Sequence, residues 1–512
     1  MVFTDLRRQL MAFVPRSWYQ YTLVPGNDTR THARKSTATW VDRSIKTLRL
    51  LLVACLCIAL ISFFLSYMHS MSSQPCNGSP RDRHCRKETS HLWGQYSSTY
   101  SVPSEISPAT PQGCEVTFVQ VLSRHGARDP TEHKSLAYGA FIDRIHKTVD
   151  NYGSDFKFIK GYKYTLGADQ LTRFGEQQMV DSGSNFYERY KHLAGSNLPF
   201  VRASGQERVV ESAKYWTQGF HEARLADKYS RIPDAFPYTI LTIPEKDGFN
   251  NSLSPNFCPA FEDSRHESDD KQDTWAKKFV PSLTERLNQN LPGANVTDEE
   301  TIYMMDLCPF DTVAYVKGDK GKLSKFCELF TMGEWRDYDY YQSLGKWYGY
   351  GNGNPLGPTQ GVGFVNELLA RLTGQPVDDH TTTNSTLDES DSTFPLDSVI
   401  YADFSHDNDM MDIYGTLGLY NLTDPLPGGR RVDAHKANGF SATWAVPFAA
   451  RLYVEKMSCG SSREEFVRIL VNDRVIPLQS CSADELGRCT LDRFVESQSF
   501  ARSGGHWDQC FV

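Results

Sequence analysis

Two largely apolar runs in the chain end in polar residues, which is the pattern of buried strands in an α/β fold. The first covers residues 116–122 and is followed by His125, and the second covers residues 398–404 and is followed by Asp407. Such runs are typical of parallel strands that helices cover on both faces. Open α/β sheets bind ligands at the carboxyl ends of their strands, so the residues after both runs are expected to form a functional site.

The rest of the pattern predicts helices and strands in alternation. Helical periodicity covers Tyr138–Val149, Gln170–Ala194, Val209–Phe220 and Val362–Leu372; strand-like runs cover Phe200–Ser204, Phe448–Val454, Phe466–Val471 and Val475–Leu478, with Asn472-Asp473 as a hairpin turn. Residues 211–345 are largely helical and acidic and suit an insertion. We therefore predict a large doubly wound mixed α/β domain with a smaller inserted all-α domain.

Size and charge limit the functional classes. At 512 residues and 40% hydrophobic composition, the chain can bury one large core or two moderate ones. Its formal net charge is −8, and no basic stripe dominates the globular part. Nucleic acid is therefore not an expected partner, because clustered Lys and Arg bind its phosphate backbone.

An apolar segment near the amino end predicts a transmembrane anchor. Residues 50–67 are apolar except for Ser62 and Ser66, and the flanking residues extend the run to 48–68. At 1.5 Å per residue, this length comes close to spanning a bilayer core. A signal anchor fits better than a cleaved signal peptide, because the 49 residues before the run are far too many for the latter.

Flanking charges and cysteines predict the orientation. Residues 1–49 hold nine Lys or Arg against three Asp, and positive flanks stay cytosolic, although basic residues at 81–87 weaken the asymmetry. Ten of the twelve cysteines follow the span, an even number that suits an oxidising compartment. We expect a cytosolic tail (1–47), a stalk (69–110) and a body (111–512) in the secretory pathway or at the cell surface, open to release by proteolysis. Five sequons on the lumenal side fit this topology: Asn77, Asn250, Asn295, Asn384 and Asn421.

The residues after the first run, Arg124-His125-Gly126-Ala127-Arg128-Asp129-Pro130, suit a phosphate-binding loop. Gly126 lets the backbone approach an anion closely. Two arginines on one tight loop repel each other unless a doubly negative group lies between them, and phosphate fits that role. A surface loop with ordinary salt bridges is the alternative for these residues alone.

Together with the distant His406-Asp407 pair, the Arg-His-Gly-x-Arg-x-Pro sequence resembles the histidine acid phosphatases, and further segments resemble their filamentous-fungal phytase subgroup. These segments are His91–Tyr96, Leu166–Asp169, Phe174–Gln178, Arg202–Gly205 with Arg208-Val209, Tyr401–Asn408 and Phe500–Gly505. The resemblance covers about residue 75 to the end. It implies the phosphoglycerate-mutase-like histidine phosphatase fold and hydrolysis of phosphate monoesters at acidic pH, without a metal or other cofactor.

The resemblance also implies roles for the residues of the predicted site. His125 would be the nucleophile that forms a phosphohistidine, and Asp407 would be the general acid that protonates the leaving alkoxide. Three arginines would hold the phosphate oxygens, and a second histidine would donate a further hydrogen bond. The residues expected to bind the substrate are Arg124, Arg128, Arg202, His406, Asn408, Gln95, Tyr96 and Lys134.

Sequence arithmetic alone leaves the pairing of the ten lumenal cysteines open. The resemblance implies five disulfides: Cys76–Cys85, Cys114–Cys459, Cys258–Cys510, Cys308–Cys327 and Cys481–Cys489. A metal site is not expected from these cysteines, because no Cys-x-x-Cys spacing occurs.

The expected substrates are phytate (myo-inositol hexakisphosphate) and lower inositol phosphates, and a broad-specificity secretory acid phosphatase is the alternative. Asp129 departs from the resemblance, because fungal phytases mostly carry an aromatic residue there. Its carboxylate would repel a polyanion. Lys134, Lys157 and Lys160 would offset that charge, unless they only form a solvated face.

Other functions account for less of the sequence. An anchored lumenal body is also the layout of Golgi glycosyltransferases, and two triplets, Asp337-Tyr338-Asp339 and Asp407-Asn408-Asp409, could bind Mn²⁺ with a nucleotide sugar. The second triplet overlaps the His-Asp pair, however. A non-enzymatic phosphate binder would not need all the chemical residues, and a phosphoglycerate-mutase-like transferase would be cytosolic and free of disulfides.

Overall fold

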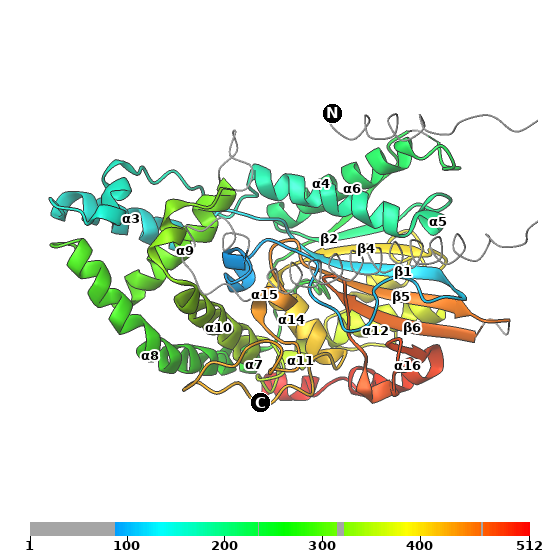
Figure 1. The fold of residues 1–512 in the computed structure, drawn as a ribbon. Helices are drawn as coiled ribbons and strands as arrows, with labels where there is room; N and C mark the ends of the chain where they lie inside the picture. The colour runs from blue at the N-terminus through cyan, green and yellow to red at the C-terminus, as the bar shows by residue number, and fades with distance from the viewer. Residues whose placement is uncertain (1–87, 234, 315–321, 462–463) are drawn as a thin grey trace, which may run out of the picture. The chain divides into compact units, whose positions relative to one another are not determined.

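The computed structural model describes residues 88–512 apart from 234, 315–321 and 462–463. They belong to one structural unit, Cys76–Val512. Its centre is an eight-stranded sheet in the order β3-β2-β4-β1-β5-β6-β7, with β8 paired to β6 (Figure 1). The strands are β1 (Cys114–Arg124), β2 (Phe200–Ser204), β3 (Ile240–Ile243), β4 (Ile400–Ser405), β5 (Arg451–Cys459), β6 (Glu464–Val471), β7 (Arg474–Val475) and β8 (Arg488–Thr490).

Parallel pairing joins β3, β2, β4 and β1, whereas antiparallel pairing joins β1 to β5 and β5 to β6. The two apolar runs are confirmed as β1 and β4, and β4 is buried along its full length. They are parallel neighbours with Arg124 opposite Ser405. The residues that follow the two strands therefore meet at one edge of the sheet.

The predicted strands near the carboxyl end are confirmed with shifted ends. β5 begins at Arg451 rather than at 448, because Ala449 has a φ of 57°, a left-handed conformation that interrupts an extended strand. Asn472 and Asp473, with φ of 48° and 67°, form the predicted tight turn between β6 and β7. β7 continues only to Val475.

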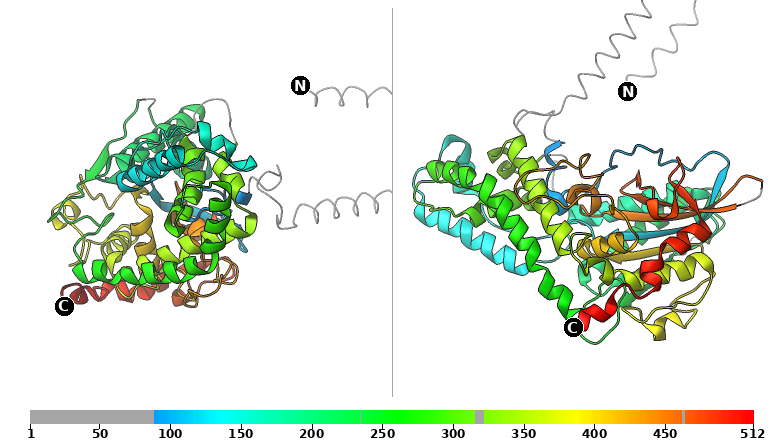
Figure 2. Two further views of the ribbon diagram at one scale, coloured as in Figure 1. Left: turned by 90° about the vertical axis from the view of Figure 1, so that its left-hand side faces the viewer. Right: turned by 90° about the horizontal axis from the view of Figure 1, so that it is seen from below.

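Helices cover both faces of the sheet and form a further group at one end of it (Figures 1 and 2). α4, α5 and α6 lie on one face, α12 and α16 on the other, and α3, α8, α9 and α10 make up the end group. The helices are α3 (Glu132–Thr148), α4 (Arg173–Arg189), α5 (Lys191–Ala194), α6 (Glu207–Ala226), α7 (Pro259–Ser264), α8 (His266–Asn290), α9 (Asp298–Ala314), α10 (Met332–Gly349), α11 (Gly357–Gln360), α12 (Val362–Thr373), α13 (Ser385–Asp388), α14 (Asp407–Thr416), α15 (Ala442–Ala445), α16 (Leu491–Ser497) and α17 (Ser499–Arg502). The 3-10 helices are η1 (Gly94–Tyr96), η2 (Ser154–Gly161), η3 (Lys325–Leu329), η4 (Gln479–Cys481) and η5 (Trp507–Phe511).

The packing of α6 corrects the predicted boundary of the inserted helical domain. Trp216 of α6 packs edge-on against Phe186 of α4 and Phe404 of β4, with ring centroids 5.1 Å and 5.8 Å away. The two helices approach closely, because a Cβ on Gly183 would lie 1.9 Å from the Trp216 carbonyl oxygen. The boundary at 211 is therefore too early, since α6 and the following β3 belong to the α/β layers and the helical group begins later.

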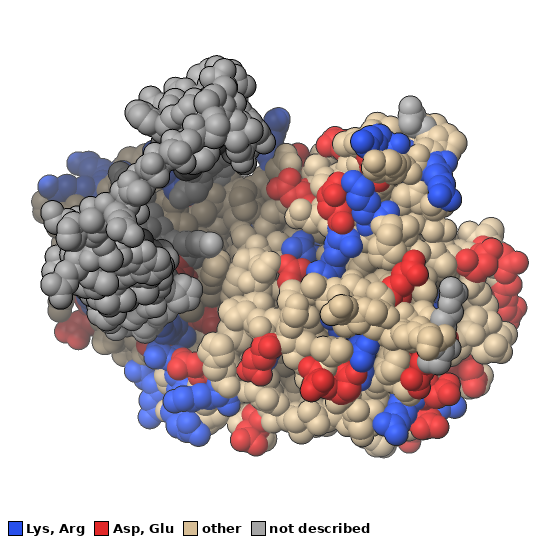
Figure 3. Space-filling model, turned by 45° about the vertical axis from the view of Figure 1, so that its right-hand side comes forward, with Lys and Arg blue, Asp and Glu red and all other residues tan. Residues whose placement is uncertain are grey.

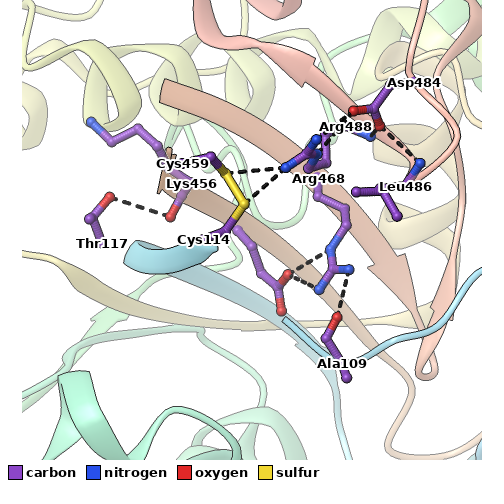
Figure 4. Close-up of a disulfide and its surroundings, with 10 residues drawn as sticks. Ala109, Cys114, Thr117, Lys456, Cys459, Arg468, Asp484, Leu486 and Arg488 are labelled. Carbon is purple, nitrogen blue, oxygen red and sulfur yellow. Dashed lines mark hydrogen bonds and ion pairs between the residues drawn. A yellow bond between two sulfur atoms is a disulfide. The ribbon is translucent and has the colours of Figure 1, made fainter. Parts of the chain in front are cut away.

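Four of the five expected disulfides are confirmed: Cys114–Cys459, Cys258–Cys510, Cys308–Cys327 and Cys481–Cys489. Cys76–Cys85 lies outside the described residues. Figure 4 shows the first bridge, which joins facing residues of β1 and β5. The Arg488 guanidinium donates to both of its sulfur atoms, at 2.9 Å and 3.2 Å, and is held by Asp484 at 2.8 Å.

The expected glycosylation sites differ in their surroundings. Asn295 and Asn421 are exposed, whereas Asn384 is half-buried and its side chain caps α13. Asn250 is also half-buried, and its Nδ2 donates to the Thr383 carbonyl oxygen at 2.7 Å. Asn77 lies outside the described residues. Of the described glycosylation sites, Asn295 and Asn421 are therefore the most accessible to a glycan.

The sequence makes predictions about two partners, nucleic acid and a membrane. On the face shown in Figure 3, Lys and Arg are interspersed with Asp and Glu. Within residues 88–512, the described helices include none that is both long and apolar enough to cross a membrane. The expected span at 48–68 lies outside the described residues, so the anchor stays a prediction.

Candidate active site

The ends of β1 and β4 bring two histidines together, as the sequence predicts. The backbone N–H of His125 donates to the Ser405 carbonyl oxygen at 3.2 Å. The imidazole rings of His125 and His406 stand edge to face, with centroids 5.6 Å apart. Asp407, the first residue of α14, follows directly. The two predicted motifs therefore form one site.

The hydrogen bonding of His125 fixes its tautomer. Its Nδ1 lies 2.8 Å from the carbonyl oxygen of Gly126, and because a carbonyl only accepts, Nδ1 carries the hydrogen. Nε2 then has a free lone pair. Burial, followed by the charges of Arg124, Arg208 and Arg128, holds the pKa of His125 well below its usual value. The neutral, nucleophilic form of the imidazole is therefore favoured.

Close packing against α4 holds the loop that carries His125. A Cβ on Gly126 would lie 2.5 Å from the Gly175 carbonyl oxygen, so only glycine fits at this position. Gln178 of α4 accepts a hydrogen bond from the backbone N–H of Ala127 at 2.9 Å. Thr172 caps α4 beneath the loop by accepting from the Gly175 N–H.

Three arginines in this region keep N–H groups without hydrogen-bond partners. The Nε atoms of Arg124, Arg128 and Arg208 are all buried and have no hydrogen-bond partner. Arg124 is fully buried, and burial lowers its pKa to about 10. Arg208 lies in the first turn of α6, and its pKa is lowered by burial and then by Arg128. Since buried donors without partners are costly, this cluster is suited to an anion with several oxygens.

The structure does not place Arg202 in this cluster. Its Nε and Nη2 bind both oxygens of Asp403 at 2.9 Å, and Nη2 also binds Glu367 at 2.6 Å. Arg202 lies two residues before the end of β2, inside the sheet, and its pKa is raised by the two carboxylates against the effect of burial. The expectation that Arg202 holds a phosphate oxygen is therefore corrected, and Arg208 takes its place in the cluster.

Two cations hold Asp407. Its Oδ1 lies 3.2 Å from Nη2 of Arg124, and its Oδ2 lies 2.5 Å from Nζ of Lys346 on α10. Although burial raises the pKa of Asp407, Arg124 and then Lys346 reverse this effect and hold it well below the usual value. Lys346 also donates to Asn408 Oδ1 at 2.5 Å. Asp407 is therefore a carboxylate in this arrangement.

A carboxylate in the segment that follows β3 orients His406. Its Nε2 lies 2.9 Å from Oε1 of Glu245, which follows β3. The same oxygen accepts a hydrogen bond from Ser204 Oγ at 2.6 Å. Nε2 therefore donates to Glu245, and this hydrogen bond fixes the orientation of the ring.

A cavity of about 630 Å³ opens beside Asp407 between η1, α8 and α10. Four predicted residues line it: Gln95, Tyr96, Lys134 and Asn408. Lys134 Nζ donates to the Tyr96 hydroxyl and to Asp306, both at 3.1 Å. Gln95 donates to Gln342 at 2.8 Å and keeps a buried Oε1 without a partner. The cavity is therefore polar, with both basic and acidic side chains at its wall: Lys134, Lys346, Arg265, Glu262, Asp263 and Asp269.

Asp129 does not face this cavity. It is half-buried and accepts a hydrogen bond from the Gly167 backbone, while burial raises its pKa. Lys157 and Lys160 are exposed on η2 and do not line the cavity. The expected repulsion by Asp129 and its offset by these two lysines therefore find no geometric support, and Lys134 alone of the three lysines lies at the cavity.

The two Asp-x-Asp triplets do not form a cation site. Asp337 pairs with Arg431 at 2.6 Å, and Asp339 accepts from the Gly94 N–H at 3.2 Å. Across the described part of the chain, no group of three or more His, Cys, Asp or Glu side chains is arranged to hold a metal ion. The glycosyltransferase alternative therefore lacks its metal site there.

Three residues of the site escaped the sequence prediction: Arg208, Lys346 and Glu245. Arg208 could have been found from the sequence, because it follows a strand at the start of a helix, where residues that bind anions are common. No sequence pattern indicated Lys346 or Glu245, since tertiary packing brings each of them to the site from a separate element. Their positions follow from the end group of helices and from β3.

Comparisons with known proteins agree with this geometry. Residues 115–472 match the histidine phosphatase superfamily (branch 2). The chain is 50% identical over 445 residues to Phytase A of Aspergillus oryzae and 51% identical over 444 residues to Phytase A of Emericella nidulans, in both cases across 86% of this chain and 95% of the relative. The crystal structure of the phytase from D. castellii has the same fold, with a TM-score of 0.67 at 23% identity, over 82% of this chain and 87% of that one. The chain therefore belongs to branch 2 of the histidine phosphatase superfamily.

Proposed function

We propose that this protein hydrolyses phosphate monoesters, with phytate and lower inositol phosphates as its substrates, through a phosphohistidine intermediate. The observation that carries the proposal is the neutral, buried His125 beside three guanidiniums with unpaired N–H groups. A phosphate dianion supplies the acceptors that these donors lack. It also places phosphorus within reach of an imidazole nitrogen that needs no base to activate it.

The reaction follows from the positions of His125 and Asp407. Nε2 of His125 attacks phosphorus, the ester P–O bond breaks, and the leaving alkoxide takes a proton from Asp407. Water then attacks the phosphohistidine, Asp407 accepts its proton, and the P–N bond breaks to release phosphate. Arg124, Arg128 and Arg208 stabilise the charge on the phosphoryl oxygens in both steps.

Substrate binding supports the protonation of Asp407. Without ligand, Arg124 and Lys346 hold its carboxylate ionised. A bound phosphate group draws on the same cations, so their hold on Asp407 weakens and its pKa rises. The proton is then most available in acid, where the phosphate monoester itself is partly protonated. This coupling accounts for an acidic optimum.

Two observations support inositol phosphates over simple monoesters. The cavity beside the catalytic residues is much larger than one phosphate group. Its wall carries three cations, Lys134, Lys346 and Arg265, together with the acidic Glu262, Asp263 and Asp269. The relatives at about half identity are called Phytase A. A broad-specificity acid phosphatase remains the second candidate, because the catalytic residues alone do not select the alcohol.

Phosphate release by the full chain across pH tests this function. Phytate, a lower inositol phosphate and p-nitrophenyl phosphate are compared by kcat/KM, with His125→Ala as the inactive control. We expect phytate to be the best substrate between about pH 4 and 6, where a carboxylic acid of ordinary pKa is still partly protonated. Equal kcat/KM for all three substrates would favour the broad-specificity phosphatase instead.

We further propose that residues 48–68 anchor the protein in a membrane of the secretory pathway or cell surface, with residues 111–512 on the lumenal or outer side. The apolar run, the basic tail before it and the confirmed disulfides support this topology. Extraction with alkaline carbonate tests the anchor. Membrane retention of the full chain, and its loss when residues 48–68 are deleted, is the expected result.

A further inference from the structure

A second cavity, of about 550 Å³, lies at the start of β5, and we call it the Arg451 cavity. Its wall includes Arg451 and Tyr453 of β5, Asn185 and Arg189 of α4, Ser101 of the amino-terminal arm, and Asp473 of the β6–β7 turn. No step of the proposed reaction uses it. Four separate parts of the chain thus build a hollow with two guanidiniums at its wall.

The guanidinium of Arg451 has only weak hydrogen-bond partners although it is buried. The residue is only 8% exposed, yet its Nε is buried without a hydrogen bond. Nη1 donates to Ser182 Oγ at a long 3.4 Å, and Nη2 lies 4.0 Å from Asp473, beyond hydrogen-bond distance. A buried charge in this condition is costly unless a ligand or water completes its hydrogen bonds.

Two other arginines near this cavity have strong hydrogen-bond acceptors. Arg468 on β6, which is 1% exposed, binds Glu455 at 2.9 Å and 2.7 Å and also donates to the carbonyl oxygen of Ala109 at 3.0 Å. Arg189 uses its guanidinium on Glu455 and the Pro108 carbonyl oxygen at 3.1 Å and 2.6 Å. Arg451 thus differs from both neighbours in lacking a strong acceptor.

The Arg451 cavity is separate from the catalytic site. Arg451 pairs with Ser123 in the β1–β5 ladder, one residue before Arg124. Because successive side chains of a strand point to opposite faces, Arg451 and Arg124 lie on opposite sides of the sheet. Arg451 faces α4, whereas Arg124 donates to the Val446 carbonyl oxygen and pairs with Asp407.

We infer that the Arg451 cavity binds a phosphate oxyanion, which Arg451 holds through its unpaired Nε and its weakly paired Nη atoms. Asn185 and Tyr453 supply further polar groups, and the volume exceeds that of a single phosphate. Both inorganic phosphate and a phosphate group of an inositol phosphate present this chemistry. Asp473, engaged by Ser101 at 2.6 Å, limits affinity because its charge opposes that of the ligand.

Calorimetric titration of the full chain with inorganic phosphate tests the inference. We expect two sites in the parent protein, one catalytic and one at Arg451. In Arg451→Gln the second site should weaken at least tenfold while the catalytic one is unchanged. Lys214→Gln is the charge-matched control, because Lys214 is exposed and pairs only with Glu211, and it should keep both sites. Titration with inositol hexasulfate distinguishes free phosphate from an inositol phosphate as the ligand of the Arg451 cavity. Two binding sites for inositol hexasulfate would mean that a whole inositol polyanion fits the cavity. One binding site would mean that the cavity accepts free phosphate only.

A single phosphate site in the parent protein, or two unweakened sites in Arg451→Gln, would overturn the inference and leave water as the occupant. If Arg451→Gln does not fold, Asp473→Asn provides an independent test. Asn tolerates the φ of 67° at this position and can still accept from Ser101. Removal of the opposing charge should tighten the second site about twofold to fivefold, the weight of one partly exposed charge. No change in Asp473→Asn would also count against the inference.

Discussion

Nη2 of Arg124 lies 3.2 Å from the carboxylate of Asp407, at the adjacent ends of two parallel strands. This ion pair joins the group proposed to bind phosphate to the group proposed to donate the proton. Lys346 reinforces it from α10 at 2.5 Å. Phosphate binding and the acidity of Asp407 are therefore coupled through shared cations, and each prediction below separates one part of this coupling.

Lys346→Met should move the pH profile. Lys346 helps to hold the pKa of Asp407 well below its usual value, so its removal raises that pKa. A general acid with a raised pKa stays protonated to higher pH, and the alkaline limb of kcat should therefore shift upward. Lys134→Met is the matched control, because Lys134 lines the same cavity but pairs with Asp306 instead. It should raise KM for phytate and leave the alkaline limb in place, and a downward shift in Lys346→Met would contradict the coupling.

His125→Ala should abolish phosphate release, with a fall in kcat of at least about 10³-fold, since the covalent step loses its nucleophile. Quenching of the parent enzyme without acid during turnover should trap a phosphohistidine that mass spectrometry assigns to His125. A fall of less than tenfold, or a phosphate found on another residue, would remove His125 from this role.

Arg208→Gln and Arg202→Gln should have different effects although both replace one buried or half-buried arginine. Arg208 has a free Nε in the proposed phosphate site, so its loss should lower kcat/KM for all monoesters about tenfold to a hundredfold, the value of one charge-assisted hydrogen bond. Arg202 binds Asp403 and Glu367, so its loss should destabilise the fold by about 3–5 kcal/mol. Thermal melting and kinetics on both variants measure the contrast. The reverse pattern would restore Arg202 to the site.

The strands that carry His125 and Asp407 could be predicted because long apolar runs signal buried parallel strands wherever they occur. The choice between Arg202 and Arg208 could not, because both belong to segments that resemble the phytases and only the register of β2 against β4 turns Arg202 toward Asp403. The role of α6 was also missed. Its apolar face, which includes Trp216, fits an inserted helical domain and a layer on the sheet equally well until its contact with Phe404 is known.

Protease treatment of intact vesicles tests the proposed topology. Residues 1–49 should be digested, while the disulfide-bonded body should be protected and should carry glycans that an amidase removes. Asn295→Gln and Asn421→Gln should each reduce its mass by one glycan, because both side chains are exposed. Digestion of the body with protection of the tail would reverse the orientation.

Asp407→Asn should damage catalysis in proportion to the help that the leaving group needs. An inositol alkoxide is a poor leaving group, so its rate should fall by about 10²–10⁴, the usual weight of general acid catalysis. p-Nitrophenolate departs almost unaided, and its rate should fall much less. His406→Ala should instead weaken both substrates alike, because His406 is expected to act on the phosphoryl group that they share. Single-turnover rates are the proper measurement, since hydrolysis of the phosphohistidine can limit steady-state turnover with the better leaving group. Equal losses for the two substrates in Asp407→Asn would show that Asp407 does not donate the proton.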